Sequence, residues 1–172
     1  MDPEPWTPDD LDVVPARSRP GLGDTIGSAV VALTMAALLV TQHLRGVVSV
    51  DNGVAVPFID PDAWGGRAQV LVGALIGGAV VAVLARRAGW TSPLVAANLG
   101  SNLVLVSVAV WLAASNTFVN TAFFDAIEST SDWRETAQVT GWVIAVLTVV
   151  LATFDSVEST VRWRRHRPRV AR

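Results

Sequence analysis

Long apolar stretches alternate with short polar segments along the chain. Four stretches consist mostly of Ala, Val, Leu, Ile and Gly, at roughly residues 26–44, 68–85, 94–114 and 138–154. At about 1.5 Å of rise per residue, a helix of such a length can cross a hydrocarbon core about 30 Å thick. A soluble domain does not segregate its apolar residues into blocks of this kind. The pattern predicts an all-α fold, a four-helix transmembrane bundle.

The connecting segments carry turn and cap signals. Residues 51–53 (Asp-Asn-Gly) form a hairpin-type turn signal between Val-rich arms. Asp60 or Asp62 is the expected N-cap of the second helix, where an acid also suits the helix dipole. Residues 92–93 (Ser-Pro) favour the start of the third helix. A short surface helix is expected over residues 118–129.

The ends of the chain differ in composition from the apolar middle. Residues 1–23 contain five prolines and five acidic residues, which discourage helix and strand. We therefore expect three regions: a disordered Pro-rich cytoplasmic tail (1–23), a four-helix transmembrane domain (24–160) and a basic cytoplasmic tail (161–172). The fourth helix is expected to continue beyond the membrane to about Arg165.

The distribution of arginine predicts an orientation. All 13 basic residues are arginines, and ten of them lie in the two termini and in the short connection after the second stretch. The two longer connections hold the other three. By the positive-inside rule, both termini should be cytoplasmic and both long loops outside. The expected location is the bacterial plasma membrane, as a multi-pass protein.

A short repeat links the two halves of the chain. The pattern W-x-x-x-A-Q-V occurs at residues 64–70 and again at 133–139. The same offset relates the first apolar stretch to the third. Duplication of a helical hairpin, with an axis along the membrane normal, and chance similarity are both open explanations.

Two glycines in the second apolar stretch form a small-residue motif. Gly73 and Gly77 are four residues apart, a spacing that lets another helix backbone approach closely. The close neighbour is either another helix of the same bundle or a second copy of the chain.

Polar side chains within the apolar stretches are the other candidates for function. Asn98 and Asn102 lie one turn apart, and we expect them to face the bundle interior, because unpaired amides in hydrocarbon are unfavourable. Asp155 lies near the cytoplasmic end of the fourth helix, at the depth expected for Arg86 in the second. An ion pair between them, with Arg87 as the alternative cation, is one interpretation. Solvation of both groups at the interface is the other.

The C-terminal tail is strongly basic. Such a juxtamembrane segment is expected to contact anionic lipid headgroups, each charge contributing about 1 kcal/mol near the surface. The arginines assigned to this contact are Arg162, Arg164, Arg165 and Arg167.

Several classes of chemistry lack the residues they need. The chain has no cysteine, and its two histidines, His43 and His166, are far apart. No nucleophile–base arrangement, phosphate loop or metal motif is present in the sequence. The net charge of −2 does not favour nucleic acid. We expect no enzyme activity, no cofactor, no metal and no nucleic-acid partner.

Several short motifs stand out at residues 57–64 (PFIDPDAW), 89–91 (GWT), 97–99 (ANL) with Asn102, 120–123 (NTAF) and 154–157 (FDSV). With these motifs the chain resembles the membrane region of bacterial HAAS-type proteins, often encoded beside PadR-like regulators. The resemblance covers roughly residues 25–165. It implies a four-helix membrane region and a signalling or regulatory association, with no catalytic residues to carry over. The N-terminal cytoplasmic HAAS domain is expected to be missing, with Pro-rich sequence in its place.

These observations favour a non-catalytic integral membrane protein with a regulatory or protein-interaction role. Its expected partners are membrane lipids and either another protein or further copies of the chain. A small transport or permeation component, with an inner polar path along Asn98, Asn102 and Asp155, is the alternative.

Overall fold

Four long helices form the protein in the computed structural model, which describes residues 20–49, 55–127 and 133–165. They are α1 (Leu22–Arg45), α2 (Arg67–Ala88), α3 (Ser92–Ala114) and α5 (Arg134–Arg165). Each is long and apolar enough to cross a membrane. The all-α bundle of four apolar helices is therefore confirmed, and helices of this length and composition indicate an integral membrane protein.

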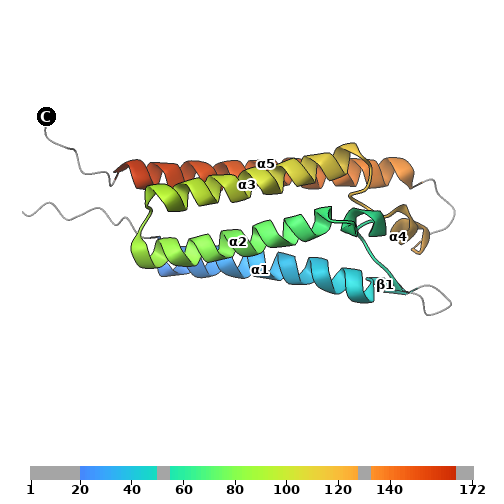
Figure 1. The fold of residues 1–172 in the computed structure, drawn as a ribbon. Helices are drawn as coiled ribbons and strands as arrows, with labels where there is room; N and C mark the ends of the chain where they lie inside the picture. The colour runs from blue at the N-terminus through green and yellow to red at the C-terminus, as the bar shows by residue number, and fades with distance from the viewer. Residues whose placement is uncertain (1–19, 50–54, 128–132, 166–172) are drawn as a thin grey trace, which may run out of the picture.

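The helices pack in the order of the chain. α1 packs against α2, α2 against α3, and α3 against α5. Figure 1 shows the α1–α2 pair lying below the α3–α5 pair. The start of α1 lies beside the end of α5, because the Asp24 carboxylate is 3.2 Å from the Arg162 guanidinium. We call this the terminal end of the bundle, and the opposite end, which carries the two long connections, the loop end.

Each helix is longer than the apolar stretch that predicted it. α1 begins at Leu22, and its first turn is stabilised by Asp24, whose carboxylate accepts the backbone N–H of Gly21. α5 begins at Arg134 and continues to Arg165, so the expected extension of the fourth helix is confirmed. Hydropathy marks the segment that lipid can solvate, whereas polar residues satisfy the helix ends beyond it.

One cap prediction is wrong. Asp60 caps a short 3₁₀ helix, η2 (Pro61–Trp64), because its carboxylate accepts the backbone N–H of Asp62 at 2.9 Å. Neither aspartate caps α2, whose N-cap is Gly66. Gly66 has a φ of 122°, a conformation that glycine adopts readily. The chain therefore turns between η2 and α2 before the longer helix can start.

The loop end is covered by short elements from both connections. β1 (Val48–Ser49) pairs antiparallel with β2 (Ala55–Val56), Val48 opposite Val56, which confirms the hairpin. Its turn, residues 51–53, lies outside the described residues. α4 (Thr121–Asp125) is the short surface helix, and it is shorter than predicted. Residues 128–129 of that prediction are also outside the described part.

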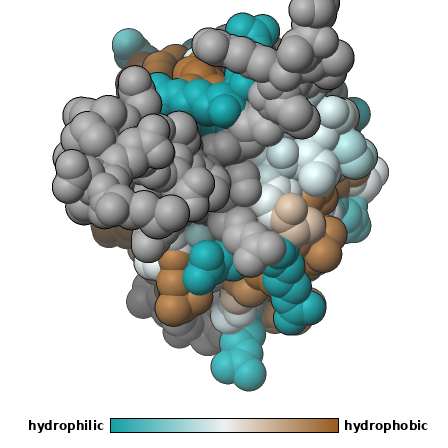
Figure 2. All heavy atoms as spheres, turned by 90° about the vertical axis from the view of Figure 1, so that its left-hand side faces the viewer, coloured by the Kyte–Doolittle hydropathy of each residue, from teal (hydrophilic) through white to brown (hydrophobic). Residues whose placement is uncertain are grey.

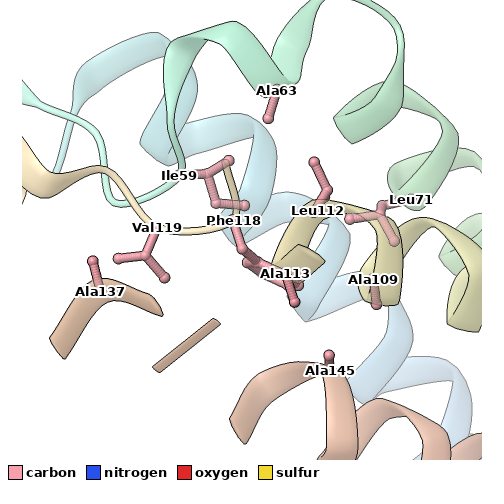
Figure 3. Close-up of a cluster of buried hydrophobic side chains, with 10 residues drawn as sticks. All are labelled: Ile59, Ala63, Leu71, Ala109, Leu112, Ala113, Phe118, Val119, Ala137 and Ala145. Carbon is pink, nitrogen blue, oxygen red and sulfur yellow. The ribbon is translucent and has the colours of Figure 1, made fainter. Parts of the chain in front are cut away.

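The best-packed core lies near the loop end. Figure 3 shows side chains from η2, α2, α3 and the segment before α4 converging there, with Ile59, Leu112 and Phe118 among the largest. Along the helices, the buried positions are mostly alanine, whereas large Val and Leu side chains point outward. Figure 2, which faces the terminal end, shows hydrophilic residues beside hydrophobic ones there. Small residues inside and large apolar residues outside are typical of helices packed in lipid.

Candidate functional site

A carboxylate in α5 binds two amides of α3. The Asp155 carboxylate accepts hydrogen bonds from Asn98 Nδ2 at 2.6 Å and from Asn102 Nδ2 at 2.8 Å. The two asparagines are one helical turn apart, so both reach the same carboxylate oxygen, Oδ2. The structure thus brings together three residues selected from the sequence. The asparagines face the neighbouring helix α5 and bond to it rather than to each other.

Hydroxyl and carbonyl groups of α5 complete this polar cluster. Asn98 Nδ2 also donates to Ser159 Oγ at 3.2 Å, and Asn102 Nδ2 to Ser156 Oγ at 3.0 Å and to the carbonyl of Ala152 at 3.3 Å. Asn98 and Ser159 are 5% and 1% exposed, whereas Asp155 is exposed. The cluster therefore fixes the register of α3 against α5. We call these five side chains, Asn98, Asn102, Asp155, Ser156 and Ser159, the amide–carboxylate cluster.

The sequence did not single out the two serines of this cluster. They follow Ala152 on one stripe of α5, at spacings of four and three residues. A serine on the small-residue stripe of an apolar helix is the signal that would have identified them.

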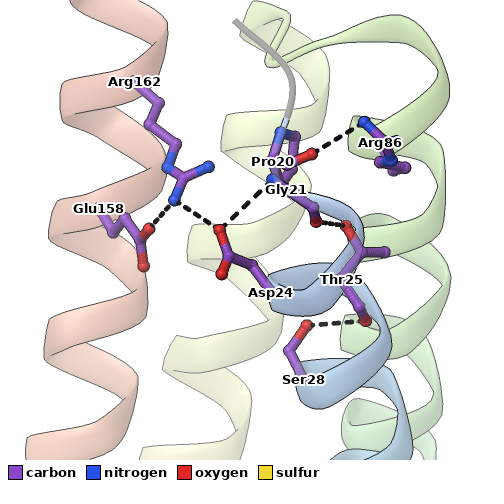
Figure 4. A network of polar contacts seen from close by, with 8 residues as sticks. All are labelled: Pro20, Gly21, Asp24, Thr25, Ser28, Arg86, Glu158 and Arg162. Carbon is purple, nitrogen blue, oxygen red and sulfur yellow. Dashed lines mark hydrogen bonds and ion pairs between the residues drawn. The ribbon is translucent and has the colours of Figure 1, made fainter. Parts of the chain in front are cut away.

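Arg86 has a different partner from the one considered for it. Its guanidinium donates to the carbonyl of Pro20 at 3.1 Å, which ties the end of α2 to the start of α1 (Figure 4). Asp155 has its donors from α3 instead. Helix α5 packs mainly against α3, so α3 rather than α2 supplies the donors to Asp155.

A second set of polar side chains lies at the terminal end of the bundle. The Arg162 guanidinium pairs with Glu158 one turn earlier in α5 and with Asp24 of α1 (Figure 4). The pair between Glu158 and Arg162 follows from their spacing. The contact with Asp24 links the first and last helices. We call Asp24, Glu158 and Arg162 the ion triad.

The two motif glycines have different surroundings. A Cβ at Gly77 would lie 3.5 Å from Ser101 Oγ, and the Ser101 hydroxyl donates to the carbonyl of Ala74 at 3.0 Å. Gly77 therefore lies at the contact between α2 and α3. Gly73 is exposed, and a Cβ there would meet open space. The motif thus has one member inside the bundle and one on its outer surface.

The basic residues at the end of α5 also differ from one another. Arg162 belongs to the ion triad, whereas Arg164 and Arg165 are exposed. Arg167 lies outside the described residues.

Two amides organise the loop end, and the sequence did not reveal them. Gln42 Oε1 accepts the backbone N–H groups of Phe58 and Ile59 at 2.8 and 3.0 Å. Asn120 Nδ2 donates to the carbonyl of Pro57 at 3.0 Å, and the Asn120 N–H donates to the carbonyl of Phe58. The two long connections are therefore joined to each other and to α1. An amide at the end of an apolar helix, such as Gln42, is the signal that could have indicated this contact.

A groove of about 550 Å³ runs along the surface between α3 and α5. Asn102 and Ser156 line it, but Asp155 and Asn98 are not part of its lining. Among the described residues, His, Asp and Glu side chains nowhere gather in threes as they would around a metal ion.

Comparisons of the chain with protein-family models, with curated proteins and with solved structures find no match. The resemblance to HAAS-type membrane proteins therefore stays a prediction based on the short motifs.

Proposed function

We propose that this chain is a non-catalytic regulatory or protein-interaction protein of the bacterial plasma membrane, with both termini in the cytoplasm. The observation that carries the proposal is the amide–carboxylate cluster. An ionisable group within a membrane-spanning helix is a functional candidate by default. Here its hydrogen bonds are used to hold one helix against another, which suits a scaffold better than a reacting or conducting site.

The length of α5 supports this proposal. At about 1.5 Å per residue, its 32 residues span about 48 Å, well over the thickness of a hydrocarbon core. The cluster fixes α5 near its terminal end, and the ion triad links α5 to α1 one to two turns further on. The last turns therefore form a rigid charged extension, suited to contact a partner at the membrane surface.

A permeation role would need a continuous polar path. Asn102 and Ser156 are the polar members of the cluster that line the groove, but most of its lining is apolar. Asp155 is not part of that lining, and its carboxylate accepts hydrogen bonds from the α3 asparagines. The geometry therefore favours the interaction role over the transport alternative.

The outer face of α2 is the proposed contact within the membrane. Ile76 and Val80 are exposed there, on the side of the helix that carries Gly73. Without a side chain at Gly73, a partner helix or a second copy can approach the α2 backbone closely.

Site-specific photocrosslinking in native membranes tests this proposal. A photoreactive residue at Ile76 should give a discrete crosslinked product, and the same residue at Val146, on an exposed part of α5, should not. Gly73→Leu should abolish the product, because its side chain separates the two helices. Equal crosslinking from both positions, or no effect of Gly73→Leu, would contradict the proposed contact on α2.

A further inference from the structure

We infer that the groove between α3 and α5 is a binding site for one anionic phospholipid. An acyl chain would lie along the groove, and the phosphate would lie at Arg164. This inference goes beyond the regulatory role and needs only that the helices lie in a bilayer.

The lining of the groove has a polar end and a mostly apolar remainder. Arg164 and Thr160 lie at the terminal end, and Asn102, Thr153 and Ser156 are the other polar side chains of the lining. The apolar side chains that line the groove are mainly Leu99, Leu103, Val106, Val149, Val157 and Val161. From Arg164 to Val149 the helix rises by about 22 Å, which exceeds the depth of one leaflet, about 15 Å. A lipid with its headgroup at the surface therefore finds apolar side chains along most of the length of its acyl chain.

The charge at the polar end selects an anion. Arg164 makes no hydrogen bond or ion pair with the described part of the chain, whereas Arg162, two residues earlier, is paired with Asp24 and Glu158. The lining includes no acidic side chain. A guanidinium next to an apolar groove suits a phosphate, to which arginine makes charge-assisted hydrogen bonds.

The shape of the groove suits an acyl chain. Its volume of about 550 Å³ is spread along about 22 Å of helix. A hydrocarbon chain can therefore lie along the groove, parallel to α3 and α5.

Native mass spectrometry of the purified full chain tests the inference. Detergent-solubilised protein is titrated with dioleoylphosphatidylglycerol and, separately, with dioleoylphosphatidylcholine. Arg164→Gln is compared with Arg165→Gln, which removes the same charge from an exposed neighbour outside the groove lining. We expect a bound phosphatidylglycerol that Arg164→Gln lowers several-fold and Arg165→Gln lowers less than twofold. Equal losses in the two variants would show diffuse attraction and overturn the inference.

A second pair of variants tests the acyl chain. Val157→Trp fills the groove, and Val146→Trp changes a side chain of equal exposure elsewhere on α5 (56% and 57%). Only Val157→Trp should lower the retention of phosphatidylglycerol. If Val157→Trp changes the helical circular dichroism or the elution volume, Leu103→Trp, in the facing wall, replaces it. Unchanged lipid retention in the groove variant, or loss of a dimer with lipid retention unchanged, would overturn the inference.

Discussion

The carboxylate of Asp155 is stabilised by donors of fixed position. Two amides from α3 converge on one carboxylate oxygen, and Asn98 bonds to a buried serine as well. A carboxylate accepts and an amide N–H donates, so the identity of each partner matters more than its size. Because each hydrogen bond has a fixed donor and a fixed acceptor, exchanging the donor and acceptor residues tests whether they interact.

Asn98→Asp should lower the stability of the bundle more than Asn98→Leu, because a second carboxylate would face Asp155. Interhelical hydrogen bonds in membranes contribute about 0.6–2 kcal/mol, and we expect the leucine variant to lose that much. The exchange variant Asn98→Asp/Asp155→Asn should recover stability, since a donor again faces an acceptor. Thermal unfolding in detergent, followed by circular dichroism, measures all three. Additive losses in the exchange variant would show that the two side chains do not interact.

The ion triad should contribute little to stability. Asp24 and Glu158 are well exposed, with side-chain exposures of 63% and 59%, so water and salt screen their attraction to Arg162. A double-mutant cycle with Asp24→Asn and Arg162→Gln should give a coupling below about 1 kcal/mol that falls as salt is added. A larger coupling that is insensitive to salt would mean that the pair is shielded from water.

Sequence reasoning identified the conspicuous side chains but not all of their partners. Asn98, Asn102 and Asp155 stand out because amides and carboxylates are rare in apolar helices. Periodicity places them on a face of a helix, but it does not say which neighbouring helix covers that face. Equal depth along the helices therefore favours Arg86 as the partner of Asp155, whereas in the structure the Arg86 guanidinium donates to the carbonyl of Pro20.

Among the helices, close approach depends on small residues at particular positions. Gly77 faces α3, and Gly141 of α5 accommodates Phe118, whose Cβ would lie 3.2 Å from an added Cβ. Gly73 faces open space. The sequence motif of two glycines did not distinguish these roles, because Gly73 and Gly77 differ by about 40° around the helix, enough to turn one toward α3 and the other outward.

Gly77→Leu should destabilise the bundle, and Gly73→Leu should not. The leucine at position 77 would enter the space of Ser101 and force α2 and α3 apart, at a cost of about 1–3 kcal/mol. The leucine at position 73 extends into lipid and has a better helix propensity than glycine. Melting temperatures in detergent compare the two. A loss of stability in Gly73→Leu equal to that in Gly77→Leu would contradict these assignments.

The positions of the four helices were predictable because lipid imposes long apolar segments on any chain that spans it. Their ends were less so, since polar residues such as Asp24 and Arg134 continue the helices beyond the apolar stretches. Of the short elements that cover the loop end, the sequence predicts the β-hairpin and the short helix α4. The amides that join them, Gln42 and Asn120, act between segments far apart in sequence.

The described part of the molecule is a bundle in which the start of α1 and the end of α5 lie at one end, as the contact between Asp24 and Arg162 shows. Large apolar side chains cover its sides, and polar groups gather at its ends. Such a surface is compatible with a bilayer around the middle of the helices and with water at both ends. Because the chain has no cysteine, single cysteines can be introduced without removing any native one.

Labelling of single cysteines by a membrane-impermeant maleimide decides whether the bundle spans a bilayer. Cysteines replace Thr117 at the loop end, Arg165 at the terminal end, and the exposed Leu103 and Leu151 of α3 and α5. In sealed vesicles of one orientation, Thr117→Cys and Arg165→Cys should be labelled from opposite sides, and the cysteines at 103 and 151 should react only after denaturation. Rapid labelling of the two mid-helix cysteines in intact vesicles would show that water surrounds these helices, and the membrane-spanning bundle would be refuted.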